Sequence, residues 1–119
     1  MASPRAAAKG ELRVFLTVED LQPQFAAYMG TPTRARGYPP SAGQHSLIIE
    51  VAPGLMIERV MDLALKADPD LEPGILFVER QFGILEIHGS DKDRLLAAGR
   101  AGLTRFGALS GSSEVGRHA

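Results

Sequence analysis

The chain has 119 residues, a formal net charge of -1, 45% hydrophobic and 23% charged residues, and no cysteine. This length fits one domain with a modest core, and the balanced charge gives no general attraction to nucleic acid or an anionic membrane. The lack of cysteine excludes disulfides, thiolate catalysis and cysteine-ligated metals. Because no signal peptide and no long apolar run is present, we expect a cytoplasmic protein.

Both ends of the chain have a composition that is typical of tails. Residues 1–10 combine Ala, Pro, Ser, Arg, Lys and Gly without apolar periodicity, and residues 110–119 are polar and rich in Gly and Ser. Such segments bury too little apolar surface to offset the entropy of ordering them. We therefore expect two disordered tails around a single domain of residues 11–109.

The predicted domain begins with a strand and a short helix. Apolar residues alternate with others over the first segment, which is the period of a strand with one buried face: Leu12, Val14, Leu16 and Val18. Pro23 fits the first turn of a helix that ends near Met29, and we expect Gly30 to stop it. Thr31–Gln44 is rich in proline and glycine and is predicted to be a long loop.

A strand and an amphipathic helix follow. The β-branched run Leu47–Val51 is predicted to be a buried strand that ends at Pro53. From Leu55 to Ala67 apolar residues recur at helical spacing. The same helix carries a polar stripe with one residue per turn: Glu58, Asp62 and Lys66.

The last part of the domain is predicted to be a hairpin and a second helix. Gly74–Glu79 and Ile84–His88 are the strands, and we expect Gly83 to supply positive φ in the turn between them. Ser90 and Asp93 resemble a capping box at the start of the helix. One face of this helix combines large and very small residues, so another backbone is expected to approach it closely: Leu95, Gly99, Gly102, Leu103 and Phe106.

No sequence motif indicates catalysis or metal binding. Phosphate loops, zinc spacings and nucleophile elbows are missing. We expect His45 and His88 to be ordinary exposed or strand-end residues. The alternative is that they pair with Glu50 or Glu86 as a metal or acid/base site. We predict no catalytic residue, metal or cofactor.

Residues 46–106 resemble the bacterial microcompartment (BMC) shell domain. Four segments carry the resemblance, in this order: Leu47–Val51, Asp62–Ala67, Phe77–Leu85 and Ile87–Ser90. The common form of this domain ends with a further strand and short helix, whereas here such a pair comes first. The chain is thus similar to the circularly permuted hexameric shell proteins of ethanolamine- and propanediol-type compartments. Arg outnumbers Lys, and Ala, Gly and Pro are common, which indicates a GC-rich genome and is compatible with a related amino-alcohol compartment.

The resemblance implies a fold, an assembly and a function. The fold is an α+β, ferredoxin-like antiparallel sheet with helices, circularly permuted. The assembly is a homohexamer that tiles, with other BMC shell proteins at its edges, into a cytoplasmic compartment shell. The function is structural, with a central pore for small metabolites, and requires no cofactor, nucleic acid or membrane.

The resemblance also assigns residues to surfaces. It places Lys66 at the hexamer edge, and Gln22 at a second edge position where many relatives have arginine, which implies weaker edges. It places Gln81, Phe82 and Gly83 around the pore, as an uncharged and partly apolar constriction beside Arg80. Permuted relatives have an N-terminal strand that forms a barrel over the pore. The first ten residues here are a poor strand, so we expect an uncapped pore.

Two other functions fit parts of the sequence. A ferredoxin-like regulatory domain would bind a small ligand between two subunits, and it predicts a dimer that ligand tightens. An enzyme that uses His45 or His88 with a carboxylate predicts loss of turnover when either histidine is replaced.

Overall fold

The computed structural model describes residues 10–33 and 37–105. Seven elements follow one another: β1 (Glu11–Val18), α2 (Pro23–Thr33), β2 (His45–Ala52), α3 (Met56–Ala67), β3 (Glu72–Val78), β4 (Gly83–Gly89) and α4 (Lys92–Arg105). The predicted tails, except for Gly10, lie outside the described residues, and so does Phe106. No helix within the described ranges is long and apolar enough to cross a membrane.

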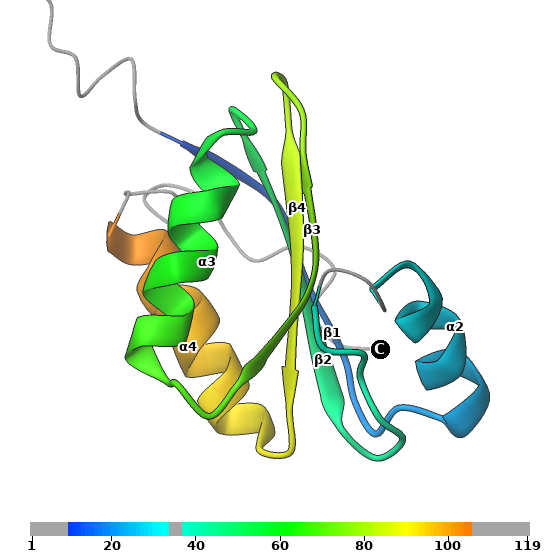
Figure 1. Cartoon of the computed structure of the whole chain (residues 1–119). Coiled ribbons are helices and arrows are strands. Elements are labelled where there is room, and N and C mark those ends of the chain that lie inside the picture. The colour runs from blue at the N-terminus through cyan, green and yellow to red at the C-terminus, as the bar shows by residue number, and fades with distance from the viewer. Residues whose placement is uncertain (1–9, 34–36, 106–119) are drawn as a thin grey trace, which may run out of the picture.

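The strands form one antiparallel sheet in the order β1-β2-β4-β3. Helices α3 and α4 cover one face of the sheet, and α2 lies against part of the other face (Figure 1). Counted from β2, the elements are strand, helix, two strands and helix, and β1 supplies the last strand of a ferredoxin-like βαββαβ unit. The α+β class is confirmed, and the strand that completes the unit comes first in the chain, followed by α2.

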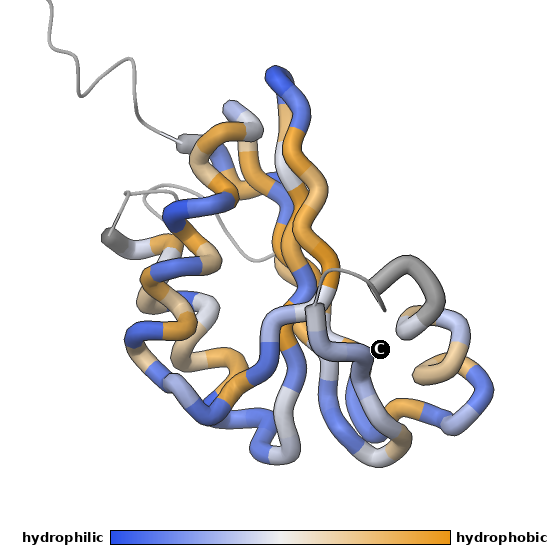
Figure 2. The backbone as a smooth tube through the Cα atoms, viewed as in Figure 1, coloured by the Kyte–Doolittle hydropathy of each residue, from blue (hydrophilic) through white to orange (hydrophobic). Residues whose placement is uncertain are grey.

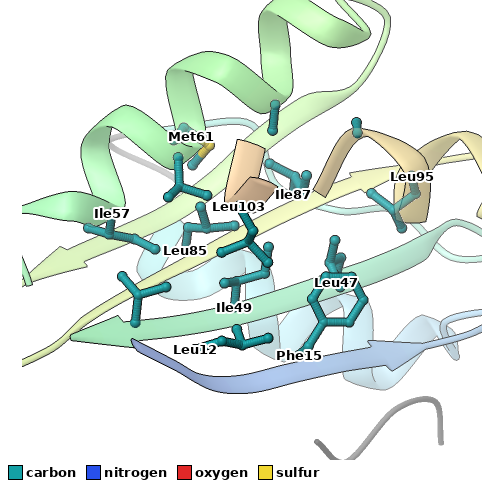
Figure 3. Packing of buried hydrophobic residues seen from close by; sticks show 14 of the residues in the cluster. Leu12, Phe15, Leu47, Ile49, Ile57, Met61, Leu85, Ile87, Leu95 and Leu103 are labelled. Carbon is teal, nitrogen blue, oxygen red and sulfur yellow. The ribbon is translucent and has the colours of Figure 1, made fainter. Parts of the chain in front are cut away.

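The core lies between the sheet and the pair α3 and α4. In β2 and β4, every second residue faces the helices, as a period of two residues requires (Figure 3). In β1 a bulge between Leu12 and Val14 shifts this phase, so the predicted buried face is wrong beyond Leu12: Phe15 and Thr17 are buried, and Val14, Leu16 and Val18 are half-buried. The most fully buried members are large aliphatic and aromatic residues: Phe15, Leu47, Ile49, Ile57, Leu85, Ile87, Leu95 and Leu103. Burial of each such side chain is favourable by about 1.5–3 kcal/mol.

Two glycines have a different role from the one predicted. Gly30 does not end α2, which continues to Thr33. Gly30 is buried, and a Cβ there would lie 3.1 Å from Cβ of Pro39, so this position leaves room for the segment that packs on α2. Gly83 does not have positive φ; in the described part of the chain, positive φ occurs at Asp20 and Gly43.

The hairpin turn closes between Glu79 and Phe82. The N–H of Glu79 donates to the carbonyl oxygen of Phe82 at 2.9 Å, which leaves Arg80 and Gln81 as the loop. Gly83 is the first residue of β4, and a Cβ there would lie 2.6 Å from the carbonyl oxygen of Gly54. Glycine is therefore needed at this position for close packing rather than for turn geometry.

The N-terminus of α4 is capped one residue later than predicted. The N–H of Arg94 donates to Oδ1 of Asp91 at 3.2 Å, so Asp91 and not Ser90 supplies the capping oxygen. Asp93 lies in the first turn, where its charge is favourable to the helix dipole.

The expected close approach to α4 is confirmed at Gly102. A Cβ at Gly102 would lie 2.7 Å from the carbonyl oxygen of Val60 and 3.3 Å from the backbone nitrogen of Ala64, so the backbones of α3 and α4 nearly touch. At Gly99 the nearest obstacle is different. A Cβ there would meet the Cδ2 atom of Leu47, at 2.5 Å, which is the end of a flexible side chain.

This difference predicts unequal effects of two matched substitutions. Gly102→Ala should lower the free energy of unfolding by about 1–3 kcal/mol, because a backbone must move. Gly99→Ala should be much milder, because Leu47 can change rotamer and alanine favours the helix by about 1 kcal/mol. Urea denaturation of both variants checks the prediction, which is wrong if Gly102→Ala is as stable as Gly99→Ala.

Candidate functional site

The tip of the β3–β4 hairpin projects beyond the other elements at one end of the molecule (Figure 1). Its loop residues Arg80 and Gln81 are exposed, as is Glu79. Among the predicted pore residues, only Gln81 is exposed. Phe82 is half-buried and Gly83 is buried within the subunit.

Phe82 leans on a neighbour in its own hairpin. Its ring centroid lies 5.8 Å from that of Phe77, with the planes tilted by 40°. Figure 2 shows apolar residues along both strands of the hairpin and a hydrophilic tip. Phe82 therefore lies where the polar tip meets an apolar region.

The start of α3 holds the base of the tip. The N–H of Gly54 donates to the carbonyl oxygen of Arg80 at 3.2 Å, and the N–H of Ile57 donates to the carbonyl oxygen of Gly54 at 3.0 Å. A side chain at Gly54 would collide with the carbonyl oxygens of Glu79 and Phe82. Two backbones thus meet here without side chains between them, which fixes the tip relative to α3.

Lys66 lies in the last turn of α3, at the end of the molecule away from the tip (Figure 1). Its side chain is 72% exposed, and Nζ lies 2.9 Å from Oδ2 of Asp62 one turn earlier. The predicted polar stripe is exposed along its whole length. Lys66 also borders a shallow depression of about 410 Å³ between α3 and α4, lined by Arg59, Leu63, Lys66, Ala67 and Ala101.

Gln22 is exposed just before α2, and its carbonyl oxygen accepts the N–H of Ala26 at 2.8 Å. Helix α2 lies on the opposite face of the sheet from α3 (Figure 1). The two predicted edge residues, Gln22 and Lys66, are therefore on different faces of the subunit.

The two histidines have different environments. His45 is half-buried at the start of β2, and its Nδ1 accepts the backbone N–H of Asp20 at 3.1 Å. His88 lies near the end of β4, as one of the two expected placements has it, and it is fully buried rather than exposed. Its Nδ1 lies 2.9 Å from Oε1 of Glu86, the partner that the sequence suggested.

Glu86 connects His88 to a serine on the neighbouring strand. Ser46 Oγ donates to Oε2 of Glu86 at 2.6 Å, and Glu72 Oε1 lies 3.4 Å from Nε2 of His88 without forming a hydrogen bond. Ser46, Glu86 and His88 are almost completely buried. The hydrogen bond between Ser46 and Glu86 links β2 to β4. Because all three side chains are shielded from solvent, they offer no surface to a substrate.

The part of the chain that the structure describes offers no metal site. The described residues contain no group of three or more His, Cys, Asp or Glu placed to hold a metal ion. The expected absence of a catalytic residue stays a prediction.

Arg94 forms a connection that sequence analysis missed. Its Nε and Nη2 donate to the two carboxylate oxygens of Asp68, at 2.8 and 2.6 Å, and Nη2 also donates to Asp70 at 2.9 Å. The hydrogen bonds that Arg94 donates to Asp68, and next those to Asp70, raise the pKa of Arg94. Asp68 and Asp70 thus tie the start of α4 to the end of α3.

Comparison with known proteins decides the family. The model of the CsoS1D N-terminal domain matches residues 12–111. The chain belongs to the CsoS1D N-terminal domain family. It is 42% identical over 97 residues to the carboxysome shell protein CcmP of Synechococcus elongatus, which covers 82% of this chain and 44% of that protein. It is also 42% identical to the carboxysome shell protein CsoS1D of Prochlorococcus marinus, which covers 82% of this chain and 37% of the relative.

Solved structures agree with this family. A double-ringed trimeric shell protein, MSM0271, from the RMM microcompartment matches with 56% identity and a TM-score of 0.74, over 83% of this chain and 46% of that one. The fused permuted hexameric shell protein MSM0275 from the same kind of microcompartment matches with 48% identity and a TM-score of 0.72, over 82% and 46%. The chain thus spans less than half the length of these CsoS1D-type relatives. They are shell proteins and not enzymes.

Proposed function

We propose that the protein is a structural component of a bacterial microcompartment shell in the cytoplasm, and that it forms a ring of six copies around a central pore. The likeness to MSM0271, at 56% identity over 83% of this chain, carries the proposal. That relative is trimeric and about twice as long. Because one chain of MSM0271 has about the length of two copies of this protein, a trimer of MSM0271 corresponds in size to a hexamer of this protein around one axis.

The hairpin tip is the element that we assign to the pore. Its projection from one end of the subunit, and the fixed position that Gly54 gives it, suit a loop that six copies direct toward one axis. Gln81 then supplies a ring of amides, with Phe82 and Gly83 directly behind it. Exposed Arg80 attracts anions, but exposed Glu79 beside it carries the opposite charge, so the pore favours small neutral or weakly polar metabolites over ions.

The end of α3 is the surface that we assign to contacts between rings. Lys66 is exposed there, and its aliphatic stem lies beside a depression able to receive a side chain of a neighbouring shell protein. Gln22 is a second, weaker contact, because an amide lacks the charge and the planar fork of arginine.

The compartment is assigned from the named relatives. They come from carboxysomes and from the RMM microcompartment, and the two RMM proteins are the more similar in sequence over the same part of the chain. We therefore propose an RMM-type compartment. The ethanolamine, propanediol and amino-alcohol assignments stay predictions.

The mass of the full-length protein in solution tests the ring. Native mass spectrometry should show a species of six chains that needs no added ligand. A dimer whose population rises with a small metabolite would contradict the ring and favour the ligand-binding regulatory domain.

Replacement of Lys66 tests the edge assignment. Lys66→Ala should leave the six-chain mass unchanged and strongly reduce the sheets seen by electron microscopy, because the contact between rings is lost. Asp62→Ala is the matched control, since it removes the 2.9 Å ion pair but keeps the lysine. Equal sheet formation by wild type and Lys66→Ala would contradict the assignment.

A further inference from the structure

An apolar surface lies beside the tip on the face of the sheet opposite α3. Phe77 is 44% exposed, and its cross-strand partner is Ile84, which is half-buried. Both alternate with Leu76 and Leu85 on the core side, so they point to the second face. Figure 1 shows α2 against the end of this face away from the tip.

A second apolar surface lies at the same end of the molecule, on the α3 side. Leu55 is 71% exposed and Pro53 is also exposed. Gly54 between them packs directly against the hairpin through its hydrogen bond to Arg80. Phe77 and Leu55 therefore both belong to segments that adjoin the tip, on opposite sides of one hairpin.

We infer that Phe77 of one copy packs against Leu55 and Pro53 of the next copy in the ring. The inference rests on the proposed ring. Each subunit of a closed ring needs two different faces that fit each other, and both apolar surfaces lie beside the element that converges on the axis. Contact between the two surfaces removes apolar area from water, which is favourable roughly in proportion to that area.

The chemistry of the two surfaces fits such a contact. Buried aromatic side chains are the commonest energetic anchors of interfaces, and Phe77 is already held in place by Phe82 at 5.8 Å. A preordered ring loses little entropy when a partner binds it. Leu55 and Pro53 offer a small uncharged surface.

Tyr28 provides a matched control. It is 74% exposed, more than Phe77, and its ring stacks on Phe25 at 6.4 Å. It lies on α2, however, away from the hairpin tip (Figure 1). Exposure alone predicts equal effects at Tyr28 and Phe77, whereas the inferred interface predicts an effect only at Phe77.

Because the chain has no cysteine, pairs of cysteines can be introduced without background. The full-length variant with Leu55→Cys and Phe77→Cys, treated with a short bismaleimide, should give a ladder of cross-linked chains up to six. The variant with Leu55→Cys and Tyr28→Cys should stay monomeric on the same gel.

A second experiment uses single substitutions in the natural, cysteine-free sequence. Phe77→Ser should convert the six-chain species largely to monomer, and Tyr28→Ser should leave it intact. Circular dichroism should show that both variants are folded.

The outcomes separate the inference from the ring itself. A wild-type mass of six chains without the Leu55–Phe77 ladder overturns the inferred interface and leaves the ring standing. A wild-type mass below six chains overturns both. Ladders of equal strength from the Tyr28 pair also overturn the interface. A benzophenone attached to the cysteine of a Phe77→Cys variant gives a further check, because photoproducts with residues 106–119 of the same chain would overturn the interface too.

Discussion

The backbone contact between the start of α3 and the β3–β4 hairpin is the constraint on which the proposed assembly depends. Gly54 donates to Arg80 at 3.2 Å, and Gly83 is packed against Gly54 and Ile57 with no room for a side chain. Because both sides of the contact are backbone, the projecting tip has one position relative to α3. A fixed tip is what six subunits need to enclose a pore of defined width, and it also sets the positions of the two apolar surfaces beside it.

Local periodicity was enough to predict the type and order of every element. Alternation in β1, helical spacing in α3 and the paired strands around Arg80 each produce a pattern within a few residues. The glycines were the exception. Gly30 and Gly83 were interpreted as sites of backbone freedom, but both provide space for a segment distant in sequence. A sequence does not distinguish these two uses of glycine, because the second depends on tertiary packing.

The polar connections were missed for the same reason. Ser46 and Glu86 are 40 residues apart, and Arg94 and Asp68 are 26 apart. No residue close to His88 in the sequence indicates that it is buried. Its burial depends on the pairing of β4 with β2 on one side and with β3 on the other. The assignments of Lys66 and Gln81 came from resemblance to a family, and the structure adds their exposure.

A single subunit of this family therefore has three distinct regions: a fixed tip, apolar surfaces beside it and an exposed helix end far from it. Their order along the molecule is the order in which a ring places pore, subunit contact and edge. Electron cryomicroscopy of the assembled full-length protein tests this arrangement most directly. We predict a six-fold axis that passes between the β3–β4 tips, with the ends of α3 at the perimeter. Tips at the perimeter, or a two-fold dimer in place of a ring, would contradict it.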